Sequence, residues 1–264
     1  MSIFKGTKRT YNWIPSPPDE RDLLYRPPLT FFAKALPTSV DLRSKCSPVV
    51  DQGDLGSCTG NAIGSGLREF MLLKAGKSFV PLSRLFIYYQ ERVAEGTTMQ
   101  DAGADLRDGM DCLMHLGVCR EVLDPYNIAN FTVAPTSVAV ADAANYKISK
   151  YLRVNGINAV KQILASGMPV VAGMDVFKQI ESSAAATTGI VSIPKTGEQA
   201  IGGHAVTVVG YQDTPRYTPG YWKGGGYWWM RNSWGKDWGV EGYFRLAYDY
   251  TNLGFMSEFW AGVL

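Results

Sequence analysis

Only two histidines and four cysteines occur in the 264 residues of the chain. The cysteines do not form the paired Cys/His spacings of a zinc site, so a zinc-binding domain is excluded. No apolar run approaches the roughly 20 residues that span a bilayer. The first residues, 1–6, lack the continuous apolar stretch of a standard signal peptide. We therefore expect no membrane association, and a protein that is cytoplasmic or exported by a non-standard route.

A strong charge of either sign is also absent. Lysine and arginine together number 26 and aspartate and glutamate 24, which gives a formal net charge of +2. No block of basic residues is long enough for a nucleic-acid-binding patch, so a nucleic-acid partner is excluded. Nothing in the sequence requires a cofactor or a metal ion. The length allows one large domain or two modest ones, and we expect a monomer.

Residues 1–38 differ from the rest of the chain because they show neither a helical nor a strand period. Prolines, which fix an extended backbone, recur in this segment at positions 15, 17, 18, 27 and 28. Aromatic side chains lie among them and make the segment too apolar for an ordinary disordered tail. We expect it to lie ordered on the main domain, anchored by Trp13, Tyr25 or Phe31.

The remaining sequence changes from helical to strand-like periodicity. Apolar residues at helical spacing predict helices over residues 59–76, 83–96, 104–116 and 158–167. Alternating β-branched and aromatic residues predict strands over residues 146–154, 169–176, 205–211, 227–232 and 242–248. Helices first and strands later indicate an α+β fold, with a mainly helical unit (39–140) and a mainly β unit (141–264).

One cysteine stands in a sequence context that suits nucleophilic chemistry. Cys58 begins the first predicted helix, where free backbone N–H groups and the helix dipole stabilise a thiolate. A thiol nucleophile needs a base and a group that orients the base, and His204 and Asn232 can fill these roles. Gln52, six residues before the thiol, can donate its amide to a developing oxyanion. The residues predict a Cys-His-Asn peptidase in which Cys58 and His204 rest as an ion pair.

The motifs around these residues resemble those of the papain/cathepsin family of cysteine peptidases. They are Gln-x5-Cys, the Gly203-His204-Ala205 strand and the block Asn232-Ser233-Trp234-Gly235-x2-Trp238-Gly239-x2-Gly242-Tyr243. The match runs in the family's order from about residue 36 to residue 264. The resemblance implies a papain-like two-lobed fold, with a helical lobe, an antiparallel β lobe and the active site in the cleft between them.

The resemblance also implies further roles. Trp234 would shield the hydrogen bond between His204 and Asn232 from water. A substrate peptide would lie extended across the cleft with its backbone against Gly103. Attack by the thiolate would give a covalent thioester that water hydrolyses. The main specificity pocket would draw on Gly173, Met174 and Ala205.

Three departures from the family pattern are visible. Leu55 replaces the cysteine that usually forms a disulfide upstream of the nucleophile, and Thr59 replaces the aromatic residue that follows it. A longer stretch between His204 and Asn232, with prolines at 215 and 219, predicts an inserted surface loop over residues 214–220. None of the three removes a catalytic group.

The other cysteines allow at most one disulfide if Cys58 stays free. Cys112 and Cys119 stand seven residues apart in a helical pattern, about 10 Å along the axis, which is too far for a bridge. Cys46 with Cys119 is the expected pair. The alternative is that all three are small buried thiols.

The resemblance predicts a cysteine endopeptidase that acts on peptides or proteins. His115, the one other histidine, lies at the end of a predicted helix and is expected to be structural, whereas the dipeptide-removing members of the family use extra histidines in an occluding loop. Two alternatives stay open: an inactive peptide-binding relative, and an acyltransferase or transglutaminase with the same triad. Residues 1–38 are expected to act as a built-in inhibitory segment, or else to cap apolar surface on the β lobe.

Overall fold

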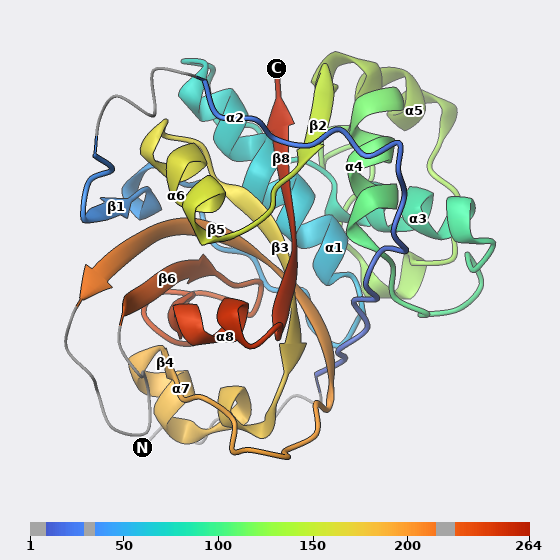
Figure 1. Ribbon diagram of the computed structural model, residues 1–264. Coiled ribbons are helices and arrows are strands. Elements are labelled where there is room, and N and C mark those ends of the chain that lie inside the picture. The colour runs from blue at the N-terminus through green and yellow to red at the C-terminus, as the bar shows by residue number, and fades with distance from the viewer. Residues whose placement is uncertain (1–8, 29–34, 215–224) are drawn as a thin grey trace.

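The computed structural model describes residues 9–28, 35–214 and 225–264 (Figure 1). The predicted surface loop after Thr214 and the predicted anchor Phe31 lie outside these residues. Within them, no helix is both long and apolar enough to cross a membrane.

A buried helix runs from Cys58 through the centre of the molecule. It consists of α1 (Cys58–Gly60), a wider π-helical stretch (Asn61–Arg68) and α2 (Glu69–Lys74). Its glycines allow close packing: a Cβ atom on Gly60 would lie 2.4 Å from the carbonyl oxygen of Arg84, and one on Gly66 would lie 2.0 Å from Oγ1 of Thr207. The residues that weaken the helix by propensity are thus the ones that let it fit between its neighbours.

The other helices that the sequence predicts are present. Ser83 caps α3 (Arg84–Glu95), which ends at Gly96 in the left-handed conformation, and Asp105 caps α4 (Leu106–His115). The helix predicted at 158–167 is α6 (Ile157–Ala165). Three short helices were not expected: α5 (Ser137–Ala143), α7 (Ser183–Thr188) and α8 (Tyr248–Asn252).

The described strands form one mostly antiparallel sheet. They are β1 (Ser39–Asp41), β2 (Lys150–Arg153), β3 (Val170–Val176), β4 (Ile190–Val191), β5 (Gly202–Thr214), β6 (Gly225–Arg231), β7 (Tyr243–Ala247) and β8 (Met256–Val263). Their order is β2-β8-β3-β5-β6-β7-β4, and β1 pairs with β5. Only the β4–β7 pair is parallel among these strands. The five strands predicted from sequence are present as β2, β3, β5, β6 and β7, whereas β1, β4 and β8 were not expected.

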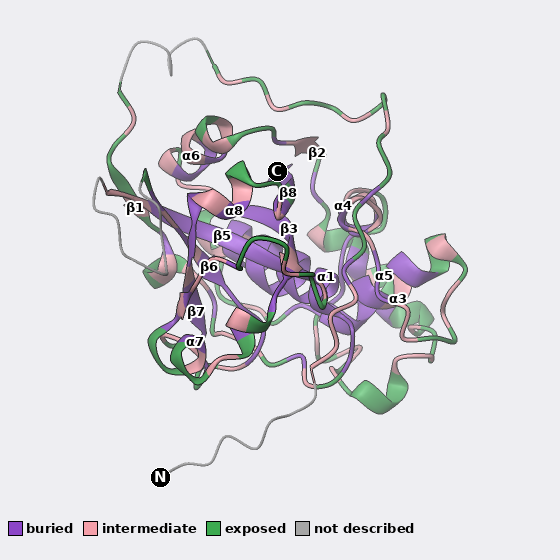
Figure 2. Ribbon diagram, turned by 60° about the horizontal axis from the view of Figure 1, so that its bottom comes forward, coloured by how far each residue is buried: buried purple, intermediate pink, exposed green. Residues whose placement is uncertain are grey.

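Two main hydrophobic clusters lie on the two sides of the central strands. One cluster fills the β lobe and contains Met174 and Phe259. The other joins the sheet to the helices and contains Cys58, Ala205 and Trp260. Figure 2 shows the buried residues concentrated in the central helix and in β3 and β5. The arrangement confirms the predicted α+β fold with a helical lobe and a β lobe.

The cysteines correct one expectation. All four are free, with Cys46 partly buried and the other three buried. Cys46 packs against the β-lobe cluster, whereas Cys119 belongs to a separate small cluster beside α5, so the predicted Cys46–Cys119 disulfide is wrong. Leu55, at the position of the missing family half-cystine, is buried beside Leu85 and fills its site with apolar volume.

The N-terminal segment, residues 9–28, is extended and lies against both lobes. Asn12 forms a parallel bridge with Gly203 of the β lobe, and Trp13 forms one with Ala104 of the helical lobe. Figure 1 shows the segment (blue) passing alongside α4 and then over the top of the molecule toward α2. The segment is therefore ordered on the main domain, as the sequence predicts.

Candidate active site

Cys58 begins α1 with its side chain fully buried. Burial raises the pKa of the thiol to about 12. The backbone N–H groups of Ala205, Thr59 and Cys58 itself lower the pKa of the thiol and so oppose that rise. The thiol lies next to Ala205, and Ala205 directly follows His204 in the chain. The start of the helix thus supplies the donors that a thiolate would need once the site is open to water.

His204 lies on β5 and is also fully buried. Its Nε2 atom lies 2.9 Å from Oδ1 of Asn232, which also accepts a hydrogen bond of 2.9 Å from the Ser233 backbone N–H. Because this amide oxygen can only accept, Nε2 carries the proton and Nδ1 keeps its lone pair. Within the described residues Nδ1 has no hydrogen-bond partner. The ring is therefore oriented as a base with a free acceptor nitrogen.

Trp234 packs on this histidine. The two rings stack with centroids 4.9 Å apart and planes 23° from parallel. The indole is itself almost fully buried and contacts Trp238 edge-on. The indole therefore covers one face of the His204 ring.

Gln52 is held in a network that the sequence analysis did not identify. Its Nε2 donates to the Leu55 carbonyl over 2.9 Å, and its Oε1 accepts from the Ser233 hydroxyl over 2.5 Å. The Gln52 backbone N–H donates to the Ser233 carbonyl, and the Tyr126 hydroxyl donates to the Gln52 carbonyl. The side-chain amide carries a second N–H besides the one that bonds to Leu55. The signal for Ser233 was its place between Asn232 and Trp234 in the motif.

The sequence predicts that Cys58 and His204 rest as an ion pair, but burial of both side chains favours different protonation states. Burial lowers the pKa of His204 to about 4, against a rise caused by the Asn232 hydrogen bond. The pKa of the Cys58 thiol moves the other way, to about 12. Both shifts favour a neutral thiol beside a neutral imidazole, because neither charge is solvated in the buried state. The ion pair is thus disfavoured while the site is covered.

Of the residues predicted to contact the substrate, Gly103, Gly173 and Ala205 lie against the N-terminal segment. A Cβ atom on Gly103 would lie 1.8 Å from the Asn12 carbonyl oxygen, and one on Gly173 would lie 2.1 Å from the Trp13 ring. Ala205 belongs to the same cluster as Trp13. Met174 does not: it points to the other face of β3 and packs in the β-lobe core, because side chains alternate along a strand. The assignment of Met174 to the pocket is corrected on this ground.

The N-terminal segment covers the candidate catalytic residues with side chains that the sequence analysis did not assign to the site. Tyr11 contacts His204 edge-on with ring centroids 6.4 Å apart, and its hydroxyl donates to Glu181 over 2.8 Å. The Arg9 guanidinium lies 4.2 Å from the centre of the Trp234 ring. These contacts explain why the catalytic side chains are closed off from solvent.

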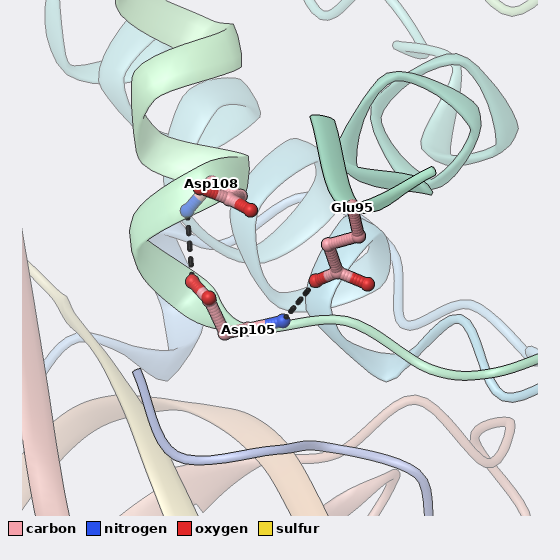
Figure 3. Close-up of side chains that lie close together, drawn as sticks. All are labelled: Glu95, Asp105 and Asp108. Atoms are coloured by element: carbon pink, nitrogen blue, oxygen red, sulfur yellow. Dashed lines mark hydrogen bonds between the residues drawn. The ribbon is translucent and has the colours of Figure 1, made fainter. Parts of the chain in front are cut away.

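Three carboxylates gather where α3 ends and α4 begins. The ligand-type oxygens of Glu95, Asp105 and Asp108 lie within 4.8 Å of one another (Figure 3). Asp105 caps α4 by accepting from the Asp108 N–H, and its own N–H donates to Glu95. Burial, followed by the charges of Asp105 and Asp111, raises the pKa of Asp108 to about 6. The hydrogen bonds give this group a structural role at the start of α4.

Comparison with known proteins agrees with this geometry. The family model for the papain family cysteine protease matches residues 36–263. An uncharacterized peptidase C1-like protein, L477, of Acanthamoeba polyphaga mimivirus is 34% identical, over 96% of this chain and 86% of that protein. Cysteine proteinase 3 of Entamoeba histolytica is 29% identical, over 83% of this chain and 66% of the proteinase.

Solved structures give the same picture. Xylellain, a cysteine protease from Xylella fastidiosa, superposes with a TM-score of 0.86 at 35% identity and covers 100% of this chain and 99% of its own. A digestive procathepsin L 3 of Tenebrio molitor has a TM-score of 0.69 at 21% identity, over 97% of this chain and 75% of its own, and so shares the fold. The chain belongs to the papain family of cysteine proteases, which are hydrolases acting on peptide bonds.

Proposed function

We propose that this chain is a cysteine endopeptidase that residues 9–28 hold latent by occupying the substrate cleft. The backbone pairing of this segment with both lobes carries the proposal. Trp13 N–H donates to the Gly203 carbonyl over 3.0 Å, and Ile14 N–H donates to the Ala104 carbonyl over 3.2 Å. An extended peptide that bonds to both walls of the cleft in this way occupies the place of a substrate.

Catalysis would begin when the segment moves away and water enters. His204 Nδ1 takes the thiol proton, and the sulfur of Cys58 attacks the peptide carbonyl carbon. The oxyanion receives hydrogen bonds from the Cys58 backbone N–H and the Gln52 amide. His204 then gives its proton to the leaving amine as the C–N bond breaks, which leaves a thioester. Water, deprotonated by His204, hydrolyses the thioester and restores the thiol.

Asn232 contributes to this cycle through the histidine ring. Its Oδ1 accepts from Nε2 in every step, which leaves Nδ1 free to exchange the thiol proton. Ser233 fixes both neighbouring groups, because its N–H holds the Asn232 oxygen and its hydroxyl holds Gln52. The triad and the oxyanion donor are thereby linked in one network.

Trp13 is the largest apolar contact that holds the segment in the cleft. Its side chain is 4% exposed and packs with Ala205 and Cys58. Truncation of a buried aromatic residue to alanine costs about 3–5 kcal/mol, and here the cost falls mainly on the closed state. We therefore expect Trp13→Ala to release the segment.

The test compares full-length Trp13→Ala with the wild type on small fluorogenic peptides. The expected result is faster hydrolysis by the variant, with the fold intact by circular dichroism. Ile14→Ala is the matched control, because Ile14 is adjacent but 49% exposed, and its activity should stay near that of the wild type. Unchanged hydrolysis by Trp13→Ala, together with a lowered melting temperature, would favour the alternative that the segment only caps apolar surface.

A further inference from the structure

The three carboxylates at the junction of α3 and α4 form no ion pair within the described residues. Oxygens of Glu95, Asp105 and Asp108 lie within 4.8 Å of one another, and all three side chains are partly buried. Figure 3 shows the Asp108 side chain directed from α4 toward Glu95 on α3. Like charges this close repel one another unless a cation lies among them.

The arginines whose charges act on this group are bonded elsewhere. Arg107 donates to Asp22 through hydrogen bonds of 2.8 and 2.7 Å. Arg92 donates to backbone carbonyls, among them those of Thr98 and Phe131. Neither guanidinium therefore neutralises the three carboxylates.

The hydrogen bonds of the group leave acceptor oxygens available. Glu95 accepts from the Asp105 N–H through Oε1, and Asp105 accepts from the Asp108 N–H and the Ser16 hydroxyl through Oδ1. Oε2 of Glu95, Oδ2 of Asp105 and the carboxylate of Asp108 accept no hydrogen bond from another described residue. Each of the three residues can thus offer an oxygen to a ligand without breaking a hydrogen bond.

A fourth carboxylate gives an independent observation. Glu91 lies one turn before Glu95 on α3 and is 0% exposed. Its Oε2 accepts from the Thr59 hydroxyl over 2.6 Å, but its Oε1 has no hydrogen-bond partner within the described residues. This oxygen faces the first turns of α4, since a Cβ atom on Gly109, the residue after Asp108, would lie 2.2 Å from it. A buried carboxylate oxygen without a donor is costly unless a cation compensates for it.

We infer that Glu95, Asp105 and Asp108 bind a calcium ion, with Glu91 behind them as a buried counter-charge. Carboxylate oxygens lie about 2.3–2.6 Å from Ca²⁺ and hence up to about 5 Å from one another, a range that includes the spacing of this group. Mg²⁺ keeps several water ligands and is usually held by one or two carboxylates, whereas Zn²⁺ favours cysteine and histidine, which the group does not contain. Three carboxylates from two elements therefore suit Ca²⁺ best.

The ion would brace the helical-lobe side of the cleft. It joins the end of α3 to the start of α4, and Ala104, directly before Asp105, accepts from the Ile14 N–H. Asp105 itself accepts from the Ser16 hydroxyl over 3.0 Å. The calcium ion thus fixes the part of the helical lobe with which residues 9–28 pair, and the inference does not depend on peptidase activity.

The test is a calorimetric titration of the full-length protein with CaCl₂ after treatment with a chelator. We expect one saturable site per chain with a Kd below about 1 mM, and a higher melting temperature in Ca²⁺ than in the same concentration of Mg²⁺. Asp108→Asn and Glu95→Gln, which keep the size of the side chains, should each raise the Kd about tenfold or more. Glu91→Gln keeps an acceptor for Thr59 and should raise it by about tenfold.

Asp111→Asn is the matched control. It removes a charge that acts on Asp108 from further along α4, but Asp111 is not part of the group and contacts His115 over 3.4 Å. The Kd of this variant should stay near that of the wild type. Circular dichroism and the melting temperature of each variant without Ca²⁺ separate a lost ligand from a misfolded protein.

Several results would overturn the inference. These are the absence of a saturable site below about 1 mM, an unchanged Kd in Asp108→Asn, Glu95→Gln or Glu91→Gln, and equal stabilisation by Mg²⁺. An equal rise in Kd in Asp111→Asn would show that the ion only screens the negative charge of α4, and this too would exclude a defined site. A raised Kd in the three variants, with the control unchanged and all folds intact, supports it.

Discussion

Two stretches of the N-terminal segment hold to the enzyme by different physical means. The crossing stretch, residues 9–16, buries Trp13 and pairs its backbone with both lobes beside His204. The clasp, residues 19–25, leaves Leu23 58% and Leu24 51% exposed. It holds through the Asp22 carboxylate and through backbone hydrogen bonds of Leu23 and Tyr25 with Arg153. The Asp22 carboxylate lies 2.7 Å from Arg107 and 3.3 Å from Arg153.

If the segment holds the peptidase latent as proposed, the crossing stretch blocks the active site and the clasp keeps the segment close to it. Apolar burial and strand-like pairing at the crossing stretch exclude water from the thiol and the imidazole. The clasp bonds to one residue of each lobe, Arg107 on α4 and Arg153 on β2, and keeps the chain near the cleft. We expect that loss of the clasp makes the segment leave the site more often. Loss of the crossing contacts should instead expose the thiol and the imidazole directly.

The largest effect should come from Cys58→Ala, because neither stretch matters if the nucleophile is absent. Peptide hydrolysis should disappear in the wild-type background and in Trp13→Ala alike. The melting temperature should change little, since the thiol contributes little core volume. Hydrolysis at the parent rate by the double variant would rule out the thioester mechanism.

The next largest effect should come from Gln52→Ala, measured with Trp13→Ala so that the crossing stretch is released. Loss of one oxyanion donor costs about 2.7–4 kcal/mol, a fall in kcat of order 10²–10³ with KM nearly constant. Asn232→Ala is the comparison and should be milder, because His204 keeps its chemistry and loses only its orientation. A rise confined to KM in Gln52→Ala would contradict the oxyanion role.

Acid should weaken the crossing stretch more than the clasp. The covered state lowers the pKa of His204 from its ordinary 6.5 to about 4, so closure is fully favoured above pH 6.5 and loses stability as pH falls toward 4. Opening should increase by up to roughly tenfold for each pH unit below 6.5. Hydrogen exchange of residues 9–16, measured between pH 7 and pH 4.5, follows this directly. His204→Gln should remove this pH dependence of hydrogen exchange. If the variant keeps the same pH dependence as the wild type, groups other than His204 cause it.

The smallest effect should come from Asp22→Asn, which weakens the clasp and leaves the crossing stretch intact. Asp22 and Arg107 are largely buried, and a hydrogen bond to a charged group contributes about 1.5–3 kcal/mol. Opening should therefore rise by about tenfold to a hundredfold, which is less than in Trp13→Ala. The rate of Cys58 labelling by an epoxide thiol inhibitor reports opening. Asp19→Asn, whose partner Arg21 is solvent-exposed, is the control and should label at the wild-type rate. A larger effect from Asp22→Asn than from Trp13→Ala would reverse the comparison.

Local signals in the sequence were sufficient for most elements. The Ser83 and Gly96 signals bound α3 as predicted, and the apolar alternation located β3 and β5. Strand β8 was missed because Glu258 interrupts its apolar pattern, and only its neighbours β2 and β3 make the carboxylate a buried residue. Met174 was placed in the pocket because the sequence does not say which face of β3 meets the cleft.

The sequence by itself determined the family, the two-lobed fold and the order of the residues proposed for catalysis, because motif spacing and periodicity are local properties. It also indicated an ordered, aromatic N-terminal segment. Only the tertiary structure decided that Trp13 enters the cleft, that Ser16 meets Glu258 across 242 residues, and that burial holds Cys58 and His204 neutral. These features depend on which distant surfaces meet and exclude water, and such pairing is a property of the packed chain.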